Sequence, residues 1–248
     1  MSLRQWQISL KSTHVKKNQK PGMERGLPRI LEILISSFGL ILAIPILAVA
    51  AVLVKMSSPG PVFFRQLRVG QHGREFVLYK FRTMCLNEFG VQFTSKDDNR
   101  ITSIGRWLRL FKIDELPELI NVVRGDLALV GPRPEVPLYV NKDNVLWKEV
   151  LKVKPGITDP VTLRLRNEED LIASAPGNKI RFYLEKLLPY KLYGYIDFIK
   201  NRTFKTDISI LFWSALAVLW PLTSPPPSIE EIEDFLNQKK LEFEEGQS

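Results

Sequence analysis

Two adjacent carboxylates, Asp114 and Glu115, stand out as residues that could do chemistry. Pro117 follows them closely. Because proline is tolerated only in the first turn of a helix, the sequence predicts that a helix begins at about 114–116. Both carboxylates would then lie at the helix N-terminus, where free backbone N–H groups could also hold a phosphate. A divalent cation could draw the pair together, since Mg²⁺ favours one or two carboxylates plus phosphate oxygens. The plainer alternative is a capping aspartate beside a solvated glutamate.

Basic residues surround this pair along the chain. Arg133 lies between two prolines that restrict its backbone, and the planar guanidinium of arginine suits phosphate oxygens. Together these cations predict a pyrophosphate substrate. Nucleic acid is the rival anion, but the sequence contains no RNP motif, zinc finger or aromatic-interleaved basic stripe. The candidate phosphate ligands are Lys80, Arg82, Arg109 and Arg133, and further cations lie at Arg106, Lys112 and Arg124.

The composition limits the classes of protein to consider. The chain has 248 residues, a formal net charge of +8 and one cysteine, Cys85. It is long enough for one hydrophobic core, and a single cysteine excludes an intramolecular disulfide framework and a cysteine metal cluster. A basic chain could meet nucleic acid, an anionic membrane or a phosphorylated substrate. The first 28 residues hold six basic residues against one acidic, and the tail after Ser224 holds seven acidic residues against two basic.

An apolar segment from Ile30 to Val54 predicts membrane attachment. It has 25 residues and one charge, Glu32, and about 20 residues suffice to cross a bilayer. Both flanks are basic, and Pro45 near the middle must kink or break a helix. These features favour a helix that dips into one leaflet and returns to the same side of the membrane. They argue against a straight span. A signal peptide cut near Ala50 fits less well, because the apolar run is too long and continues past that point.

The rest of the chain predicts an α/β fold, mainly helical with a small sheet. Residues 61–70 and 74–84 are expected to form two strands joined by a turn. Helical patterns cover three segments: 100–123 with a break near 112–114, 138–153, and 177–201 with an interruption at Pro189. A second apolar run, 208–222, is too short to span and predicts an interfacial or a packed helix, with Trp213 and Trp220 suited to a membrane boundary.

The expected organisation has four parts. Residues 1–28 form a basic, poorly ordered N-terminus, and 29–55 form the re-entrant membrane helix. Residues 56–223 form a compact catalytic domain with interfacial amphipathic helices. Residues 224–248 form an acidic tail, expected to be poorly ordered apart from a short helix at about 229–243.

Four motifs in order resemble the bacterial sugar transferases called monotopic, or small, phosphoglycosyl transferases. The resemblance covers about Arg29 to Leu211. The motifs are "PRILE", "SPGPVFFRQLRVGQHGREFVLYKFRTM", "KIDELPELINVVRGDLALVGPRPE" and "KPGIT". The resemblance implies transfer of a sugar 1-phosphate from a UDP-sugar to undecaprenyl phosphate, with release of a nucleoside monophosphate. It also implies a bacterial inner-membrane enzyme whose catalytic domain faces the cytoplasm, and which begins a cell-surface glycan extended by downstream glycosyltransferases.

The resemblance also assigns roles to residues. It implies that Asp114 of the Asp114–Glu115 dyad attacks the β-phosphate, forms a covalent phosphosugar intermediate and binds Mg²⁺. Lys80 and Arg133 match essential cations of the family. Two alternatives remain open: a membrane-anchored scaffold or binding protein without turnover, and a phosphohydrolase that uses Asp114 with water as the acceptor.

Besides Glu32, which stands where an aspartate is usual in the family, the chain departs from the family pattern in two places. Ile44 replaces the serine that precedes the proline of the re-entrant helix, here Pro45. After "KPGIT" the family's "GWAQVNGRN" is replaced by "DPVTLRLRNEED". This second segment is expected to line the nucleotide or sugar pocket. Its candidate substrate contacts are Arg164, Arg166 and Asn167.

Overall fold

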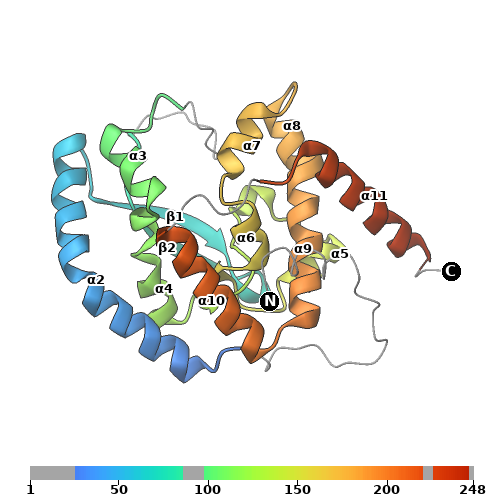
Figure 1. The fold of residues 1–248 in the computed structure, drawn as a ribbon, viewed down its shortest axis with the longest axis horizontal. Coiled ribbons are helices and arrows are strands. Elements are labelled where there is room, and N and C mark those ends of the chain that lie inside the picture. Colours follow the sequence, from blue (N-terminus) through green and yellow to red (C-terminus); the bar gives the residue numbers. More distant parts are fainter. Residues whose placement is uncertain (1–25, 86–97, 220–225, 246–248) are drawn as a thin grey trace.

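The computed structural model describes residues 26–85, 98–219 and 226–245, and it shows a mainly helical fold with two small sheets (Figure 1). The predicted class, α/β and mainly helical, is confirmed, with the strands divided between two sheets. The longest helix, α2 (Arg29–Ser57), forms one side of the molecule, and α9 (Leu188–Asn201) and α11 (Ile229–Glu245) lie toward the other. Most of the predicted N-terminal segment 1–28 lies outside the described residues.

The predicted hairpin is confirmed as an antiparallel pair, β1 (Phe63–Val69) and β2 (Glu75–Phe81). The reversal between the strands requires left-handed backbone at His72 (φ 58°) and at Gly73 (φ 72°). Glycine adopts that conformation without steric cost. The hairpin brings Lys80 to the end of β2, next to the second half of the chain.

The second sheet is a parallel pair, β3 (Ala128–Val130) and β4 (Gly156–Thr158). Parallel strands end at the same edge, so the segments that follow them lie together. The backbones pack so closely that a Cβ atom at Gly156 would lie 2.2 Å from the Gly131 backbone nitrogen. This approach fixes the segment that carries Arg133 against the start of β4.

The helical pattern of residues 100–123 breaks where predicted, near Lys112–Asp114. The first part is α3 (Ser103–Leu110). Lys112 then adopts a left-handed conformation (φ 55°), which is uncommon for a residue other than glycine, and the chain enters a 3₁₀ turn at Ile113–Glu115. Pro117 directly precedes α4 (Glu118–Arg124), so the helix begins two to four residues later than the predicted 114–116, and the dyad lies in the 3₁₀ turn before it and not in its first turn.

The predicted helix 177–201 forms, but its predicted interruption at Pro189 is wrong. α8 (Lys179–Phe182) passes through a π-helical turn at Tyr183–Leu187 directly into α9. Pro189 has no backbone N–H and would clash with the preceding turn of a regular helix. The wider turn accommodates the proline, so the helix continues.

The helix predicted over 138–153 is shorter than expected. The Asn144 side chain accepts hydrogen bonds from the backbone N–H groups of Leu146 and Trp147, so α5 (Val145–Val150) begins there. The preceding residues form a 3₁₀ turn at Pro137–Tyr139. The remaining helices are α6 (Pro160–Arg164), α7 (Glu168–Ser174) and α10 (Phe204–Leu219).

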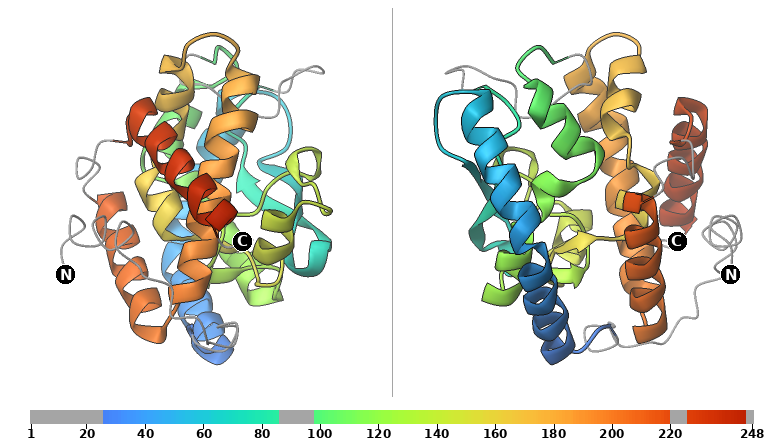
Figure 2. Two further views of the ribbon diagram at one scale, coloured as in Figure 1. Left: turned by 90° about the vertical axis from the view of Figure 1, so that its right-hand side faces the viewer. Right: turned by 60° about the vertical axis from the view of Figure 1, so that its left-hand side comes forward.

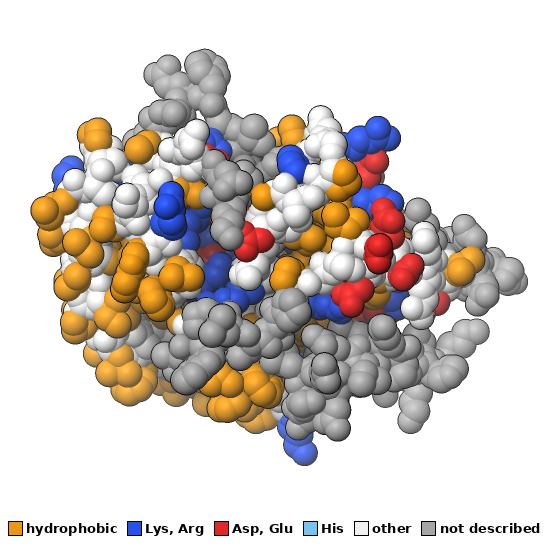
Figure 3. All heavy atoms as spheres, turned by 45° about the horizontal axis from the view of Figure 1, so that its top comes forward, with side chains coloured by type: hydrophobic (Ala, Val, Ile, Leu, Met, Phe, Trp, Pro, Cys, Tyr) orange, Lys and Arg blue, Asp and Glu red, His pale blue; other side chains and the backbone are white. Residues whose placement is uncertain are grey.

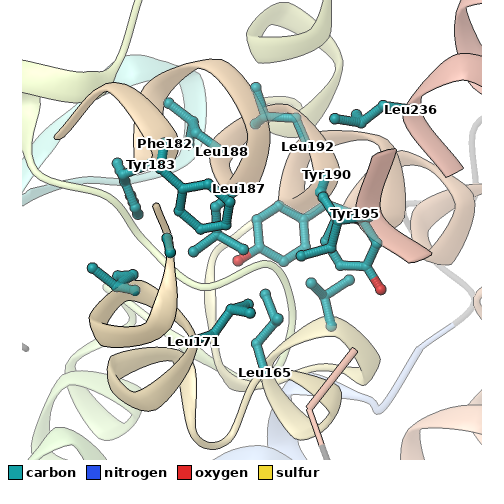
Figure 4. Close-up of a cluster of buried hydrophobic side chains, with 14 of the residues drawn as sticks. Leu165, Leu171, Phe182, Tyr183, Leu187, Leu188, Tyr190, Leu192, Tyr195 and Leu236 are labelled. Carbon is teal, nitrogen blue, oxygen red and sulfur yellow. The ribbon is translucent and has the colours of Figure 1, made fainter. Parts of the chain in front are cut away.

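The main hydrophobic core surrounds α9, as Figure 4 shows for Leu187, Tyr195 and their neighbours. The helix predicted in the acidic tail is confirmed as α11, and its Ile232 and Leu236 are buried in this core. Glu231 of α11 forms an ion pair with Arg164 of α6 (3.1 Å). The tail helix is therefore part of the packed structure.

α2 is long and apolar enough to cross a membrane, with a mean hydropathy of 2.7 in an 18-residue window. It contains Pro45 and bends between its two halves (Figures 1 and 2). Figure 3 shows hydrophobic side chains gathered along the left and lower margins of one face of the molecule. The exposed large apolar residues of α2 include Ile30, Leu34, Phe38, Ile41, Leu42, Ile44, Ile46, Val49, Val52 and Met56.

Both ends of α2 are bonded to the same domain. At the N-terminal end, the buried Glu32 carboxylate accepts a hydrogen bond from the Leu129 backbone N–H of β3 (3.1 Å), and Arg29 donates to the Leu127 carbonyl oxygen (3.3 Å). At the C-terminal end, α2 is bonded to Arg82, just after β2. The helix therefore lies along the domain over its whole length.

α10 corresponds to the second apolar run. Ile210 is buried in the core, whereas Ile208 and Phe212 are exposed. The helix thus packs on the domain and presents an apolar face, so both of the predicted alternatives stay open. Trp213 is half-buried, and Trp220 lies outside the described residues.

Candidate active site

A broad cleft lies between the hairpin, α3, the segment after β4, and α9, and the dyad lies on its floor. Figure 3 looks onto this part of the molecule, where basic and acidic side chains gather in a central hollow. Asp114 and Glu115 belong to the 3₁₀ turn that follows the left-handed Lys112. The turn changes the direction of the chain between α3 and α4, and it brings both carboxylates against the end of β2.

The two carboxylates of the dyad have different partners. Glu115 accepts from Lys80 Nζ (3.1 Å) and from both terminal nitrogens of Arg133. Asp114 is 6% exposed, and its Oδ1 atom has no hydrogen-bond partner within the described part of the chain. The structure therefore brings four predicted site residues together and leaves one buried carboxylate oxygen of Asp114 unbonded.

A third carboxylate, Glu118, completes this cluster and was missed by the sequence analysis. Its Oε1 atom lies 3.1 Å from Lys80 Nζ and 4.0 Å from Arg133 Nη2, and the residue is 1% exposed. Residues three apart lie on the same face of a helix, so its spacing from Glu115 was the signal that could have identified it. Lys80 and Arg133 are thus each shared between two glutamates.

Burial and charge separate the pKa values of the three carboxyl groups. Burial, together with the neighbouring Glu115 charge, raises the pKa of Asp114. Burial would also raise the pKa of Glu115, but Arg133 and Lys80 hold it well below its usual range. Burial raises the pKa of Glu118, against the effect of Lys80. Glu115 is therefore the carboxylate that neutralises the cations, and Asp114 is the more basic of the adjacent pair.

Arg109 and Arg82 also line the cleft, but each contacts another group. Arg109 forms an ion pair with Glu169 of α7 (2.9 Å), and its buried Nη1 atom has no hydrogen-bond partner within the described residues. Arg82 Nη2 donates to the carbonyl oxygens of Val54 (3.2 Å) and Ser58 (2.6 Å) at the C-terminal end of α2. Arg82 therefore connects the cleft to α2, and its role as a phosphate ligand stays a prediction.

The segment that departs from the family pattern begins a helix. Asp159 is fully buried and caps α6 by accepting from the backbone N–H groups of Val161 (2.7 Å) and Thr162 (3.0 Å), with Pro160 as the first helical residue. The Asp-Pro pair thus replaces a flexible turn with a capped helix.

The three candidate contacts of this segment lie in different places. Arg166 and Asn167 line the cleft, and Arg166 donates to the carbonyl oxygens of Ala217 and Leu110. Arg164 instead bonds to Glu231 of α11, and it does not line the cleft. The structure therefore brings two of the three residues toward the dyad, and Arg164 is separated from them.

The cleft can accommodate an anion with several negative charges. Its cations outnumber the carboxylates around the dyad. Seven basic side chains line the cleft there, namely Lys80, Arg82, Arg106, Arg109, Lys112, Arg133 and Arg166, against the carboxylates of Asp114, Glu115, Glu169 and the adjacent Glu118. Within the described residues, no group of three or more His, Cys, Asp or Glu side chains is arranged to hold a metal ion. A cation bound here would therefore take part of its coordination from a bound substrate, and the unbonded oxygen of Asp114 is the protein ligand available to it.

Comparison with known proteins places the chain in a family. A family model described as bacterial sugar transferase matches residues 23–221. A UDP-N-acetylgalactosamine-undecaprenyl-phosphate N-acetylgalactosaminephosphotransferase of Aeromonas hydrophila is 41% identical over 52% of this chain and 32% of its own length. The UDP-glucose:undecaprenyl-phosphate glucose-1-phosphate transferase of Escherichia coli is 35% identical over 74% of this chain and 41% of its own length.

A further relative is matched over more of its length. The UDP-glucose:undecaprenyl-phosphate glucose-1-phosphate transferase of Caulobacter vibrioides is 32% identical over 77% of this chain and 69% of its own length. The chain thus spans less than half of two of these relatives and about two thirds of the third. The matched part of the chain contains the dyad, the two cations shared by Glu115 and Glu118, and the whole of α2 and α10. The chain belongs to the bacterial sugar transferase family.

Proposed function

We propose that this protein is a membrane-bound phosphoglycosyl transferase that moves a sugar 1-phosphate from a UDP-sugar to undecaprenyl phosphate. The observation that carries the proposal is Asp114, a buried carboxylate with an unbonded oxygen on the floor of a cationic cleft. The names of the three relatives describe transfers to undecaprenyl phosphate, from UDP-activated sugars. The sugar is not assigned, because those relatives differ in theirs.

The proposed reaction has two phosphoryl transfers. Asp114 attacks the β-phosphorus of the UDP-sugar, and the bond from that phosphorus to the bridging oxygen breaks, so UMP leaves with the electron pair. A phosphate oxygen of undecaprenyl phosphate then attacks the same phosphorus and displaces the Asp114 carboxylate. The raised pKa of Asp114 supports this role, because a more basic carboxylate is a better nucleophile once it is deprotonated.

Lys80 and Arg133 would bind the pyrophosphate in this reaction. Both already lie beside the dyad and are held there by Glu115 and Glu118. In the free site, Glu115 neutralises them. When a pyrophosphate supplies competing negative charge, Glu118 still holds the cations in position. Arg109, with its unbonded Nη1 atom, is the next donor along the cleft wall.

We also propose that the site binds Mg²⁺ with its substrate. The fit rests on the unbonded Oδ1 atom of Asp114 and on the engagement of Glu115 by two cations, which leaves one carboxylate for the metal. Mg²⁺ commonly takes one or two carboxylates and completes its shell with phosphate oxygens and water. The ion would offset the charge of the pyrophosphate.

The proposed membrane arrangement is a re-entrant α2 in the bacterial inner membrane, with the catalytic domain (56–223) facing the cytoplasm. The bonds that Glu32 and Arg82 make at opposite ends of α2 support it, because both join the helix to one domain. A straight span would carry one end of α2 to the far side of the bilayer, away from those partners. The cytoplasmic face is also where a nucleotide sugar is available, and the lipid product would begin a surface glycan that downstream glycosyltransferases extend.

A release assay tests the reaction. The purified protein is supplied with Mg²⁺, a panel of UDP-sugars, and undecaprenyl phosphate either present or absent. We expect sustained UMP release with at least one sugar, only in the presence of the lipid acceptor. Release that continues without acceptor would indicate a phosphohydrolase. A protein that releases no UMP under any condition would match the scaffold alternative.

Thiol labelling tests the membrane arrangement. Single cysteines are placed at Ser2 and at Ser228 in a Cys85→Ser background, and intact spheroplasts are treated with a membrane-impermeant reagent. Both cysteines should stay unlabelled until the membrane is permeabilised. Labelling of position 2 alone in intact spheroplasts would show that α2 spans. Pro45→Leu should shift some molecules to that spanning form. An unchanged labelling pattern would exclude Pro45 as the reason that α2 turns back to the same side of the membrane.

A further inference from the structure

The inner end of the cleft contains a buried hydroxyl group that the proposed chemistry at the dyad does not use. Tyr195 of α9 lines the cleft and is 1% exposed, and its Oη atom has no hydrogen-bond partner within the described part of the chain. A buried polar group left without a partner destabilises the folded state. A phenylalanine would fill the same position without that penalty, so the hydroxyl itself requires an explanation.

The polar groups around Tyr195 are already bonded to one another. Glu135 accepts from the Tyr183 hydroxyl (2.6 Å) and from Lys191 Nζ (2.7 Å), and Lys191 also lies 3.4 Å from Glu168. Arg68 approaches Glu135 at 3.7 Å. The charges of Arg133 and the buried Asp159 also act on Tyr195. Three cations therefore face three carboxylates, and the inner end is close to neutral.

This balance distinguishes the inner end from the dyad end. Around the dyad, seven cations face four carboxylates, and this excess of positive charge suits phosphates. The cations are Lys80, Arg82, Arg106, Arg109, Lys112, Arg133 and Arg166, and the carboxylates are Asp114, Glu115, Glu118 and Glu169. The inner end instead suits an uncharged group with hydroxyls. Burial raises the pKa of Tyr195, so its hydroxyl stays protonated and can both donate and accept a hydrogen bond.

The order of events in the proposed reaction identifies that group. UMP must leave after the first step, whereas the sugar phosphate stays attached to the protein until the lipid acceptor arrives. Trp107, which is exposed, and the neighbouring Arg106 line a part of the cleft that is open to solvent, and the nucleotide would leave from there. The part retained on the protein therefore belongs at the enclosed end.

We propose that the Tyr195 hydroxyl binds a hydroxyl or ring substituent of the donor sugar, and that the pocket formed by Tyr195, Tyr183 and Lys191 selects the sugar. This inference rests on the proposed phosphoglycosyl transfer. Tyr195 would thus contribute to sugar specificity, while the dyad and its cations act on the pyrophosphate that every donor shares.

The test compares Tyr195→Phe with the wild type in the full-length protein. The variant should keep its melting temperature or gain in it, because it loses an unbonded buried hydroxyl. Its kcat/KM for the preferred UDP-sugar should fall about 10-fold, the effect of one hydrogen bond to substrate. Its ranking of UDP-sugars should change, whereas competitive inhibition by UMP, which has no sugar, should stay as in the wild type.

Tyr190→Phe is the matched control. Tyr190 lies on the same helix and is also buried, at 5% exposed, but it packs against Phe235 of α11 and does not line the cleft. Its removal should leave both kcat/KM and the sugar ranking unchanged.

Two results would overturn the inference while the proposed function stands. One is a Tyr195→Phe protein with normal kcat/KM and normal sugar ranking, which would give the hydroxyl no role in binding. The other is weaker inhibition by UMP in parallel with the loss of kcat/KM, which would assign the pocket to the nucleotide. A wild type that releases no UMP from any UDP-sugar would overturn the proposed function, and this inference with it.

Discussion

Two buried ion-pair clusters in this protein differ in how completely their atoms are bonded. In the first, Asp207 accepts from the Leu27 backbone N–H (2.8 Å) and from Arg202, which also donates to the Val130 carbonyl oxygen (2.8 Å). In the second, around Glu115, the Oδ1 atom of Asp114 is buried without a hydrogen-bond partner among the described residues. Both carboxylates are buried. Burial alone therefore does not distinguish a carboxylate that stabilises the fold from one that takes part in function.

The difference lies in what each cluster can still bind. The Asp207 cluster joins the segment before α2, the end of β3 and the start of α10, and its carboxylate oxygens are both engaged. It can only hold the fold together. The dyad cluster lies on a cleft and keeps an atom available for a ligand, at the cost of a buried polar group without a partner. The following predictions test this contrast, in order of decreasing expected effect.

Asp114→Asn should reduce kcat by about 10⁴-fold, a loss typical of removing a nucleophile. The same change should not lower stability. The pKa of Asp114 is raised by folding, so its charged form opposes folding above the ordinary pKa of an aspartate, and a neutral amide removes that opposition. UMP release and thermal unfolding measure the two effects on one sample. Near-normal turnover in this variant would exclude Asp114 as the nucleophile.

Asp207→Ala, in contrast, should lower the stability of the protein. Removing one partner of a buried ion pair leaves Arg202 uncompensated, and we expect a loss of about 3–5 kcal/mol in the free energy of unfolding. Denaturation in detergent measures it. Arg181→Ala, which breaks an exposed pair with Glu185, is the control and should change little. Unaltered stability of Asp207→Ala would remove the contrast between the two clusters.

Arg133→Lys should reduce kcat/KM by about 10- to 100-fold while the protein stays folded. Lysine keeps the charge that Glu115 and Glu118 bind, but it loses the planar geometry that suits phosphate oxygens. Arg164→Lys is the matched control, since Arg164 bonds to Glu231 outside the cleft. Equal kinetics for the two variants would assign Arg133 a purely structural role.

The pH dependence of kcat/KM should show the smallest effect. The active form of Asp114 is deprotonated, and its pKa is raised, so activity should decline on acidification at a pH above the usual aspartate range. In Glu115→Gln, whose residual rate should still be measurable, the loss of the neighbouring negative charge should move this decline to lower pH. A shift to higher pH would contradict the electrostatic account.

The sequence predicted those features that depend on local rules. Pro117 indicated the start of the helix after the dyad to within a few residues, and the segments rich in Val, Phe and Tyr around "GQHG" predicted the hairpin. The cations near the dyad predicted a cationic site, and the structure brings Lys80 and Arg133 onto Glu115, whereas the pyrophosphate substrate stays a prediction. Each of these rests on residues close together in the chain or on a restricted backbone.

Other features depend on packing that no local pattern reveals. Pro189 predicted an interruption, but a π-helical turn upstream absorbs it. Arg164 and Arg166 are two residues apart, yet one faces α11 and the other the cleft, because α6 ends between them. The spacing of Glu118 from Glu115 was a local signal, but its pairing with Lys80 follows from the approach of β2 to α4. The unbonded hydroxyl of Tyr195 is likewise visible only when its surroundings are known.

The double attachment of α2 has a mechanical consequence. A soluble enzyme tied to a bilayer by a flexible linker samples many heights and orientations above the surface. Here the bonds of Glu32 and Arg82 leave no free linker between the anchor and the domain. Arg82 is also two residues from Lys80, just after the same hairpin, so in the proposed arrangement the depth of α2 in the lipid would set the height of the dyad above the membrane. The enzyme would then meet an acceptor that diffuses in two dimensions, at a depth determined by the apolar face of one helix.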